Sequence, residues 1–222
     1  MNKKVWLINV IMNSMVLCLT IVAIFLMFFA NNGALGTGNI TSFKFFTVDS
    51  NVLMEIASAV SLFYLLFKKD KQYPKWLIVF KLVASTGVGL TFFVVFVFLA
   101  PLYGLPLLLQ GSNLIMHLFE PLVAIVLMVL FEPKAKLKFI YNLFSIIPVG
   151  VYGTFYMINV AVNNDFGNFK GADWYGFGQW GLGVGFICLF MTVAAAFVFS
   201  IILYLVHQKT KIKRLFREEK SQ

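Results

Sequence analysis

Charged residues are scarce in this sequence. Only 12% of its 222 residues are Asp, Glu, Lys or Arg, whereas 60% are hydrophobic and 17% are aromatic. A soluble domain has about 25% charged residues, and runs of roughly 20 apolar residues are typical of transmembrane helices. The composition therefore indicates a polytopic membrane protein that spends nearly its whole length on spans and has no room for a separate soluble domain.

Cysteine is almost absent as well. The two cysteines, Cys18 and Cys188, both fall inside apolar runs. Neither belongs to a CxxC pair or to a spacing typical of metal ligands, so the pair says nothing about a redox compartment. We expect both to pack as small buried side chains, and we expect no metal ion and no cofactor.

Acidic residues are half as common as basic ones, with 9 Asp and Glu against 18 Lys and Arg, and the net charge is +9. This balance alone would be compatible with nucleic-acid binding, but its distribution argues against that partner. Fifteen of the 18 basic residues lie just beyond an apolar run, in clusters at residues 3–4, 68–75, 134–138 and 209–220. Such clusters mark the cytoplasmic side of a membrane protein and contact anionic headgroups. Membrane lipids are therefore the expected partners, and nucleic acid is not.

Six apolar runs divide the chain. They cover about residues 5–30, 45–67, 76–100, 113–131, 139–162 and 179–206. With both termini inside, the three outer loops hold only Lys44 and Lys170. Isolated strands cannot satisfy their backbone in lipid, so we predict an all-α fold. The expected architecture is one domain over residues 1–222, with six transmembrane helices and both termini in the cytoplasm.

Two of the six runs carry polar residues at helical spacing. Residues three or four apart share one face of a helix, and the polar positions of the second run are Thr47, Asn51, Glu55 and Ser58, while those of the fourth are Asn113, His117 and Glu120. Lipid cannot satisfy these groups, and ionisable residues inside a membrane usually have a function and a partner. We therefore expect the two stripes to face each other around a polar cavity that opens outward and is closed towards the cytoplasm.

The residue types in these stripes are those of an activated nucleophile. Thr47 and His117 lie at comparable depth, and Glu55 lies about 12 Å deeper than Thr47 at the rise of an α-helix. A threonine hydroxyl needs an adjacent base, and histidine suits that role near neutral pH. Carboxylates that could orient the base, and amides that could donate to an oxyanion, are also present: Asp49, Glu55 and Glu120, and Asn51 and Asn113.

Two further positions bear on this cavity. Tyr152 and Tyr156 form a milder polar stripe with Asn159 in the fifth run, and they are candidates for lining the same space, although aromatic packing explains the two tyrosines equally well. Lys81 lies five residues into the third run. We expect its long side chain to extend to the cytoplasmic interface, as lysines near helix ends do.

Short motifs around these residues resemble a known family. The sequence K-F-F-T at residues 44–47, continued as F-T-V-D-S-N over residues 46–51, is similar to a segment of the androgen-induced and androgen-dependent six-helix membrane proteins and of their bacterial relatives. The family's histidine precedes a proline, as His117 precedes Pro121 here. The segment W-Y-G-F at residues 174–177 looks like a degenerate form of the family's W-x-Y-P-F.

These relatives are integral-membrane threonine hydrolases that act on fatty acid esters of hydroxy fatty acids. The resemblance implies that Thr47 is the nucleophile, that His117 is the base and that the region of Trp174 supports the site. It implies a lipid-like ester as substrate and, with the bacterial form of the motif, a bacterial plasma membrane as location.

Two other functions remain open at this stage. A small ion- or proton-coupled transporter would use Asp49, Glu55, His117 and Glu120 as its path. No matching route is visible in the cytoplasmic half apart from Asn9, Asn13 and Lys81. A noncatalytic membrane scaffold would use the same polar groups only to fasten helices together.

Overall fold

The structure is a computed structural model that describes residues 3–29, 40–68, 73–133 and 135–209. These residues form helices joined by turns, with no strand among them. Six helical segments within the described chain are long and apolar enough to cross a membrane. The all-helical class and the six predicted spans are therefore confirmed by length and composition. Many of the basic residues used to orient the chain lie outside the described residues, including Lys69, Lys71, Lys134 and those of residues 210–222.

Three of the six segments are nearly continuous helices. They are α1 (Lys3–Phe29), α2 (Phe46–Phe67) and α10 (Leu182–Lys209). The short 3-10 helix η1 (Ile40–Lys44) precedes α2. Each segment has the long apolar run that defines a span, and α10 begins a few residues later than residue 179, where the sequence placed its start.

The other three segments change helix type along their length. The third is α3 (Lys75–Val94) with the π-helical turn η2 (Val95–Leu99). The fourth consists of α6 (Ser112–Leu114), the π turn η3 (Ile115–Phe119), α7 (Glu120–Val126) and the π turn η4 (Leu127–Phe131). The fifth consists of η5 (Phe139–Tyr141), α8 (Asn142–Ser145) and α9 (Ile147–Asn163).

The connection between the third and fourth segments is helical, although the sequence suggested a loop over residues 101–112. It contains α4 (Ala100–Tyr103) and α5 (Leu105–Leu108), each with a proline in its first turn. Proline fits the first helical turn because no intrahelical partner exists there for its missing N–H. Gly104, with a φ of 78°, separates the two short helices. α5 carries Leu108, whose carbonyl is a hydrogen-bond partner of His117.

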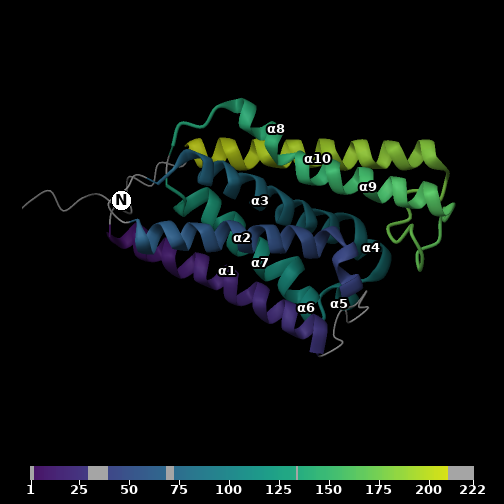
Figure 1. The fold of residues 1–222 in the computed structure, drawn as a ribbon, viewed down its shortest axis with the longest axis horizontal. Helices are drawn as coiled ribbons and strands as arrows, with labels where there is room; N and C mark the ends of the chain where they lie inside the picture. Colours follow the sequence, from purple (N-terminus) through teal and green to yellow (C-terminus); the bar gives the residue numbers. More distant parts are fainter. Residues whose placement is uncertain (1–2, 30–39, 69–72, 134, 210–222) are drawn as a thin grey trace, which may run out of the picture.

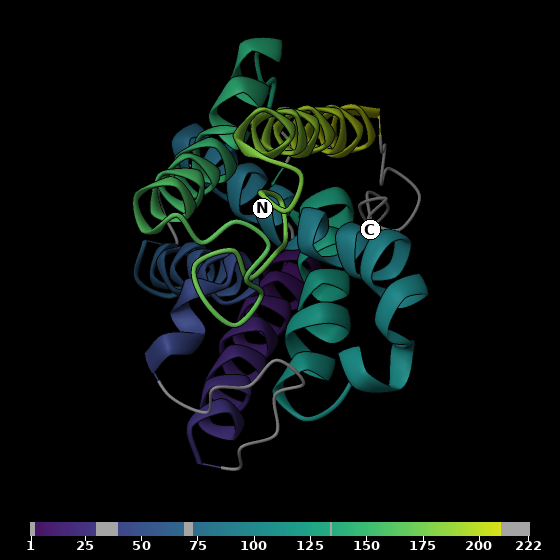
Figure 2. The same ribbon diagram turned by 90° about the vertical axis from the view of Figure 1, so that its right-hand side faces the viewer.

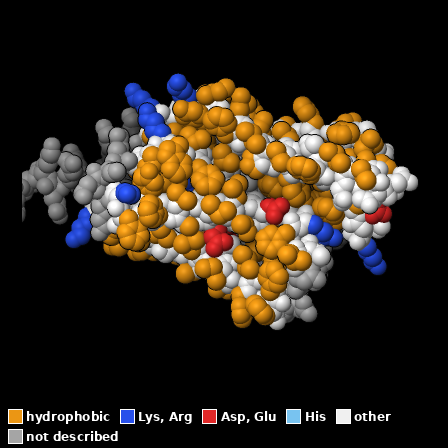
Figure 3. All heavy atoms as spheres, in the orientation of Figure 1, with side chains coloured by type: hydrophobic (Ala, Val, Ile, Leu, Met, Phe, Trp, Pro, Cys, Tyr) orange, Lys and Arg blue, Asp and Glu red, His pale blue; other side chains and the backbone are white. Residues whose placement is uncertain are grey.

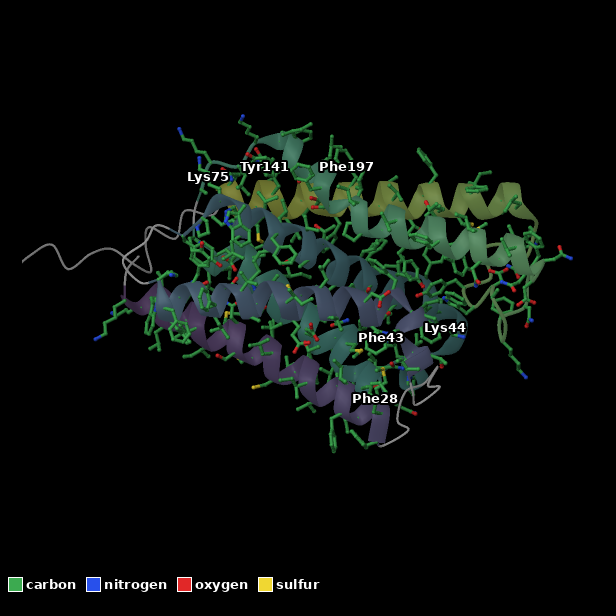
Figure 4. All side chains as sticks on the ribbon, in the orientation of Figure 1. Phe28, Phe43, Lys44, Lys75, Tyr141 and Phe197 are labelled. Atoms are coloured by element: carbon green, nitrogen blue, oxygen red, sulfur yellow. The ribbon has the colours of Figure 1, made fainter. Side chains whose placement is uncertain are left out.

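The six segments run roughly along the long axis of the molecule (Figure 1). α1 begins and α10 ends at the same end of the bundle, which we call the terminal end. The opposite end, where residues 164–181 fold over the helices, is called the loop end (Figure 2). Lys75 lies at the terminal end and Lys44 at the loop end (Figure 4).

α3 is the central helix of the bundle. In its most apolar part 56% of the residues are buried, against 17% in α10. Hydrophobic side chains are exposed over much of the sides of the molecule, as Figure 3 shows for one face. Few soluble monomers present apolar patches of such extent. The surface is therefore compatible with a multi-pass membrane protein.

The π turn η3 has a local cause. Pro121 stands in the first turn of α7 and has no N–H to donate to the carbonyl of His117, four residues earlier. A π turn holds an extra residue, so the side chains beyond it are rotated from the positions that α-helical spacing assigns. This rotation lies between His117 and Glu120, two residues that the sequence placed on one stripe.

Candidate functional site

A small cavity of about 50 Å³ lies near the loop end. It brings together residues from α1, η1, α2, the start of the fourth segment and the segment 164–181. Its apolar lining is Met27, Phe45, Val48, Leu99 and Met116, and its polar lining is Ser42, Thr47, Ser112, Asn113, His117 and Tyr175. Three predicted site residues, Thr47, Asn113 and His117, therefore share one cavity, which we call the loop-end cavity.

Thr47 is held in the first turn of α2. Its carbonyl accepts hydrogen bonds from Ser50 Oγ at 3.0 Å and from Asn51 Nδ2 at 2.7 Å. The N–H of Phe46, which has no partner inside the helix, donates to the hydroxyl of Tyr175 at 3.0 Å. The backbone under Thr47 is therefore fixed from both sides, while its side chain stays half-buried against the cavity.

Asn51 connects α2 to the π turn η3 by hydrogen bonds. Besides Thr47, its amide nitrogen donates to the carbonyl of Met116 at 3.3 Å, and the residue is fully buried. An amide has two N–H groups, so both are engaged. Of the two amides considered as donors to an oxyanion, Asn51 and Asn113, Asn51 instead ties the turn of Thr47 to the turn of His117.

His117 lies in the π turn η3 and is 4% exposed. Its Nδ1 lies 2.8 Å from the carbonyl oxygen of Leu108 in α5. A carbonyl can only accept, so Nδ1 carries the hydrogen, and in the neutral ring Nε2 is left as the proton acceptor. This is the tautomer that a general base needs. The sequence did not indicate Leu108, because residues 101–112 were expected to form a loop.

Asn113 presents an unused donor. Its side chain lines the cavity, and its buried Nδ2 has no hydrogen-bond partner among the described residues. Buried polar groups in native proteins are nearly always paired, and each exception calls for an explanation. A donor of this kind, next to a hydroxyl and an imidazole, is suited to bind an oxygen of a ligand.

Tyr175 is a cavity residue that sequence reasoning missed, as are Ser42 and Ser112. It stands in the segment W-Y-G-F that was compared with a family motif, but only Trp174 was singled out there. Burial raises the pKa of Tyr175 to about 12, so its phenol stays protonated near neutral pH. Its position on both the cavity and the start of α2 could not be inferred without knowing how residues 164–181 fold back.

The remaining aromatic candidates anchor the loop end and do not line the cavity. Tyr152 donates to the carbonyl of Lys44, and the indole N–H of Trp174 donates to the Tyr152 hydroxyl at 3.3 Å. Tyr156 donates to the buried carboxylate of Asp173. The Lys44 ammonium lies 5.2 Å from the centre of the Trp174 ring. These contacts fasten residues 172–178 over the first turn of α2.

The carboxylates predicted to join the site lie elsewhere. Asp49 is half-buried and interacts electrostatically with Tyr152 and Tyr175. Glu55 and Glu120 interact with each other deeper in the bundle, and neither lines the loop-end cavity. The loop-end cavity is therefore lined by the outer members of both stripes and not by Asn51, Glu55 or Glu120. Glu120 follows η3 at the start of α7 and interacts with Thr20 of α1.

A second group of polar residues lies towards the terminal end. Lys81 is fully buried, donates to Ser58 Oγ at 2.7 Å and lies 3.9 Å from Glu132 Oε1. The prediction that Lys81 extends to the aqueous interface is wrong, because Ser58 and Glu132 satisfy its ammonium inside the bundle. Glu132 was not recognised in the sequence, where it reads as the first residue after a span.

Tyr73 extends this group to the edge of the spans. Its hydroxyl donates to Ser61 Oγ at 2.8 Å, and it interacts electrostatically with Glu132. Burial and the charge of Glu132 raise the pKa of Tyr73 well above its ordinary value. We call Lys81, Glu120 and Glu132 the buried charged cluster.

No metal-binding group is apparent in the described part of the chain: nowhere there do three or more His, Cys, Asp or Glu side chains gather as ligands. Cys18 is exposed and Cys188 half-buried, and neither forms a disulfide.

No family model, curated protein or solved structure matches this chain.

Proposed function

We propose that this protein is a multi-pass enzyme of a bacterial plasma membrane that hydrolyses lipid-like esters, with Thr47 as nucleophile and His117 as general base. The observation that carries the proposal is that these two residues, from helices far apart in sequence, line one cavity. The orientation follows from the basic clusters: with the terminal end in the cytoplasm, the loop-end cavity lies in the outer half of the membrane.

The chemistry needs only groups of this chain. His117 Nε2 takes the proton of the Thr47 hydroxyl as that oxygen bonds to the ester carbon and the carbonyl electrons move to its oxygen. Asn113 Nδ2, whose donor is unused, hydrogen-bonds this oxyanion. Breakdown expels the alcohol, which takes the proton from His117. Water, activated by the same imidazole, then releases the fatty acid and restores the Thr47 hydroxyl.

The size of the cavity limits what it holds. One water needs about 10–15 Å³ of a cavity in this measure, so about 50 Å³ corresponds to a few waters and can take an ester group. The chains of a substrate would run out past the apolar lining, in particular Met27, Val48 and Met116, into the surrounding lipid. This arrangement favours substrates whose ester group lies near the membrane interface.

The experiment uses the full chain in lipid nanodiscs, a fluorogenic fatty acyl ester and a fluorophosphonate probe. We expect the wild type to hydrolyse the ester and to be labelled at Thr47. Thr47→Ala should abolish both signals, and Thr47→Ser should retain labelling. Thr192→Ala is the matched control, because Thr192 lies on α10 and bonds only the carbonyl of Cys188. Hydrolysis and labelling that survive Thr47→Ala would contradict the proposal.

A second candidate function is proton- or ion-coupled transport. It is favoured by the buried charged cluster, which supplies the polar groups towards the terminal end that this function requires. Flux into proteoliposomes that is lost in Glu55→Gln and unchanged in Thr47→Ala would support this function over hydrolysis.

A further inference from the structure

The buried charged cluster contains two acidic side chains and one basic one. Lys81 and Glu120 are 0% exposed and Glu132 is 1% exposed, and they come from α3, from α7 and from the residue after η4. Three ionised groups would leave one negative charge in the interior of the bundle. A charge buried in an apolar environment is strongly unfavourable unless it is paired.

Lys81 is paired with Glu132. The Lys81 ammonium lies 3.9 Å from Glu132 Oε1, and the two groups form an ion pair. The same ammonium donates to Ser58 Oγ at 2.7 Å. Lys81 interacts with Glu120 only through space, as the weaker of its two acidic neighbours. The positive charge of the cluster is therefore taken by Glu132.

Glu120 has no ion-pair partner among the described residues. Neither of its carboxyl oxygens accepts a hydrogen bond from the residues that the structure describes. The hydroxyl of Thr20 on α1, which interacts with Glu120, donates its hydrogen to the carbonyl of Val16 at 3.0 Å. Glu55 on α2 faces Glu120 with the same sign of charge, and Lys81 on α3 is engaged with Glu132.

We propose that Glu120 is a proton-binding site inside the bundle, and that its proton exchanges with the terminal end through Glu132 and Tyr73. A protonated carboxyl makes the cluster neutral and removes the unpaired charge. The route follows neighbouring groups: Glu120 interacts electrostatically with Lys81, Lys81 pairs with Glu132, and Glu132 interacts electrostatically with Tyr73, which precedes α3. The inference is independent of whether Thr47 attacks an ester.

Infrared spectroscopy of the full-length protein in nanodiscs tests the site directly, since the C=O stretch of a protonated carboxyl is separate from that of a carboxylate. At neutral pH we expect this band in the wild type, its loss in Glu120→Gln and its retention in Glu55→Gln, the matched control on the facing helix. Absence of the band from the wild type, or its survival in Glu120→Gln, would overturn the proposal. Glu120→Gln is nearly isosteric and needs no proton, so we expect it to fold.

Exchange tests the route. In D2O the band should shift as the proton is replaced by deuterium, and Tyr73→Phe should slow the shift severalfold without changing the size of the band. An equal exchange rate in the two proteins would overturn the route through Tyr73.

A third variant tests the ion pair of Lys81 and Glu132. Lys81→Met removes the counter-charge of Glu132, so the infrared band of a second protonated carboxyl should appear. An unchanged band would contradict the assignment of the pair.

Discussion

The loop-end cavity and the buried charged cluster both draw on the fourth membrane segment and differ in what surrounds their polar groups. The fourth segment supplies His117 to the cavity and Glu120 to the cluster, and α2 supplies Thr47 to the cavity and Ser58 as a partner of Lys81. In the cavity the side chains border open space. In the cluster they pack against one another and are fully buried. A hydroxyl and an imidazole beside space are suited to a ligand, whereas packed charges must be neutralised in place.

Substitutions at the cavity should act mainly on activity, and substitutions in the charged cluster should act mainly on stability.

Replacing His117 should have the largest effect, and it should fall on activity. His117→Ala removes the proposed base, and we expect hydrolysis of a fluorogenic ester to fall by about 10⁴-fold or more. Stability should change by only about 1 kcal/mol, the typical contribution of the hydrogen bond to Leu108. His207→Ala, which changes the other histidine of the chain, should keep its activity. If the two variants lost hydrolysis equally, His117 would not be the general base.

Breaking the ion pair of the charged cluster should have the opposite signature. Lys81→Met leaves Glu132 buried without its counter-charge, and loss of one partner of such a pair costs about 3–5 kcal/mol. Denaturant unfolding of the protein in detergent micelles measures this change, while activity per folded molecule should stay near that of the wild type. The double variant Lys81→Met, Glu132→Gln should recover most of the stability. A double variant as unstable as the single one would show that charge is not the cause.

Replacing Asn113 should lower activity without lowering stability. If its amide stabilises an oxyanion, Asn113→Leu should reduce the rate by about 10²–10³-fold, as loss of one such donor does in other hydrolases. The folded protein should be as stable as the wild type or more so, because an unpaired buried donor is removed. Thermal unfolding and ester hydrolysis of one sample measure both effects. A large loss of stability with normal activity would make Asn113 structural.

Replacing Asn51 should affect both properties modestly, because this residue joins the two helices that carry Thr47 and His117. Asn51→Ala removes hydrogen bonds to the carbonyls of Thr47 and Met116, at an expected cost of about 1–3 kcal/mol. Activity should fall as the two helices lose their fixed spacing. Asn163→Ala is the control: Asn163 is exposed and bonds only Asn159, so its effect should stay within about 0.5 kcal/mol.

Sequence patterning accounts well for the spans and only in part for the site. The stripes of the second and fourth runs contain buried residues, among them Asn51, His117 and Glu120, and Thr47, Asn113 and His117 line one cavity. The stripes were assigned with a uniform helical period, which the π turn before Pro121 breaks, so Glu120 was placed with His117 in error. Lys81 was misplaced for a different reason: a lysine near a helix end normally reaches water, and its partner Glu132 belongs to another segment.

The sequence by itself determined that the chain is all-helical, that six segments are long enough to span a membrane, and where each begins and ends to within a few residues. These properties depend on local composition, because an apolar run in lipid must form the hydrogen bonds of its backbone N–H and C=O groups within itself. Only the tertiary structure decided that Tyr175 folds over Thr47, that Leu108 sets the tautomer of His117 and that Glu132 holds Lys81 inside the bundle. Each of these contacts joins residues far apart in the chain or across a turn, and such contacts depend on which helices become neighbours.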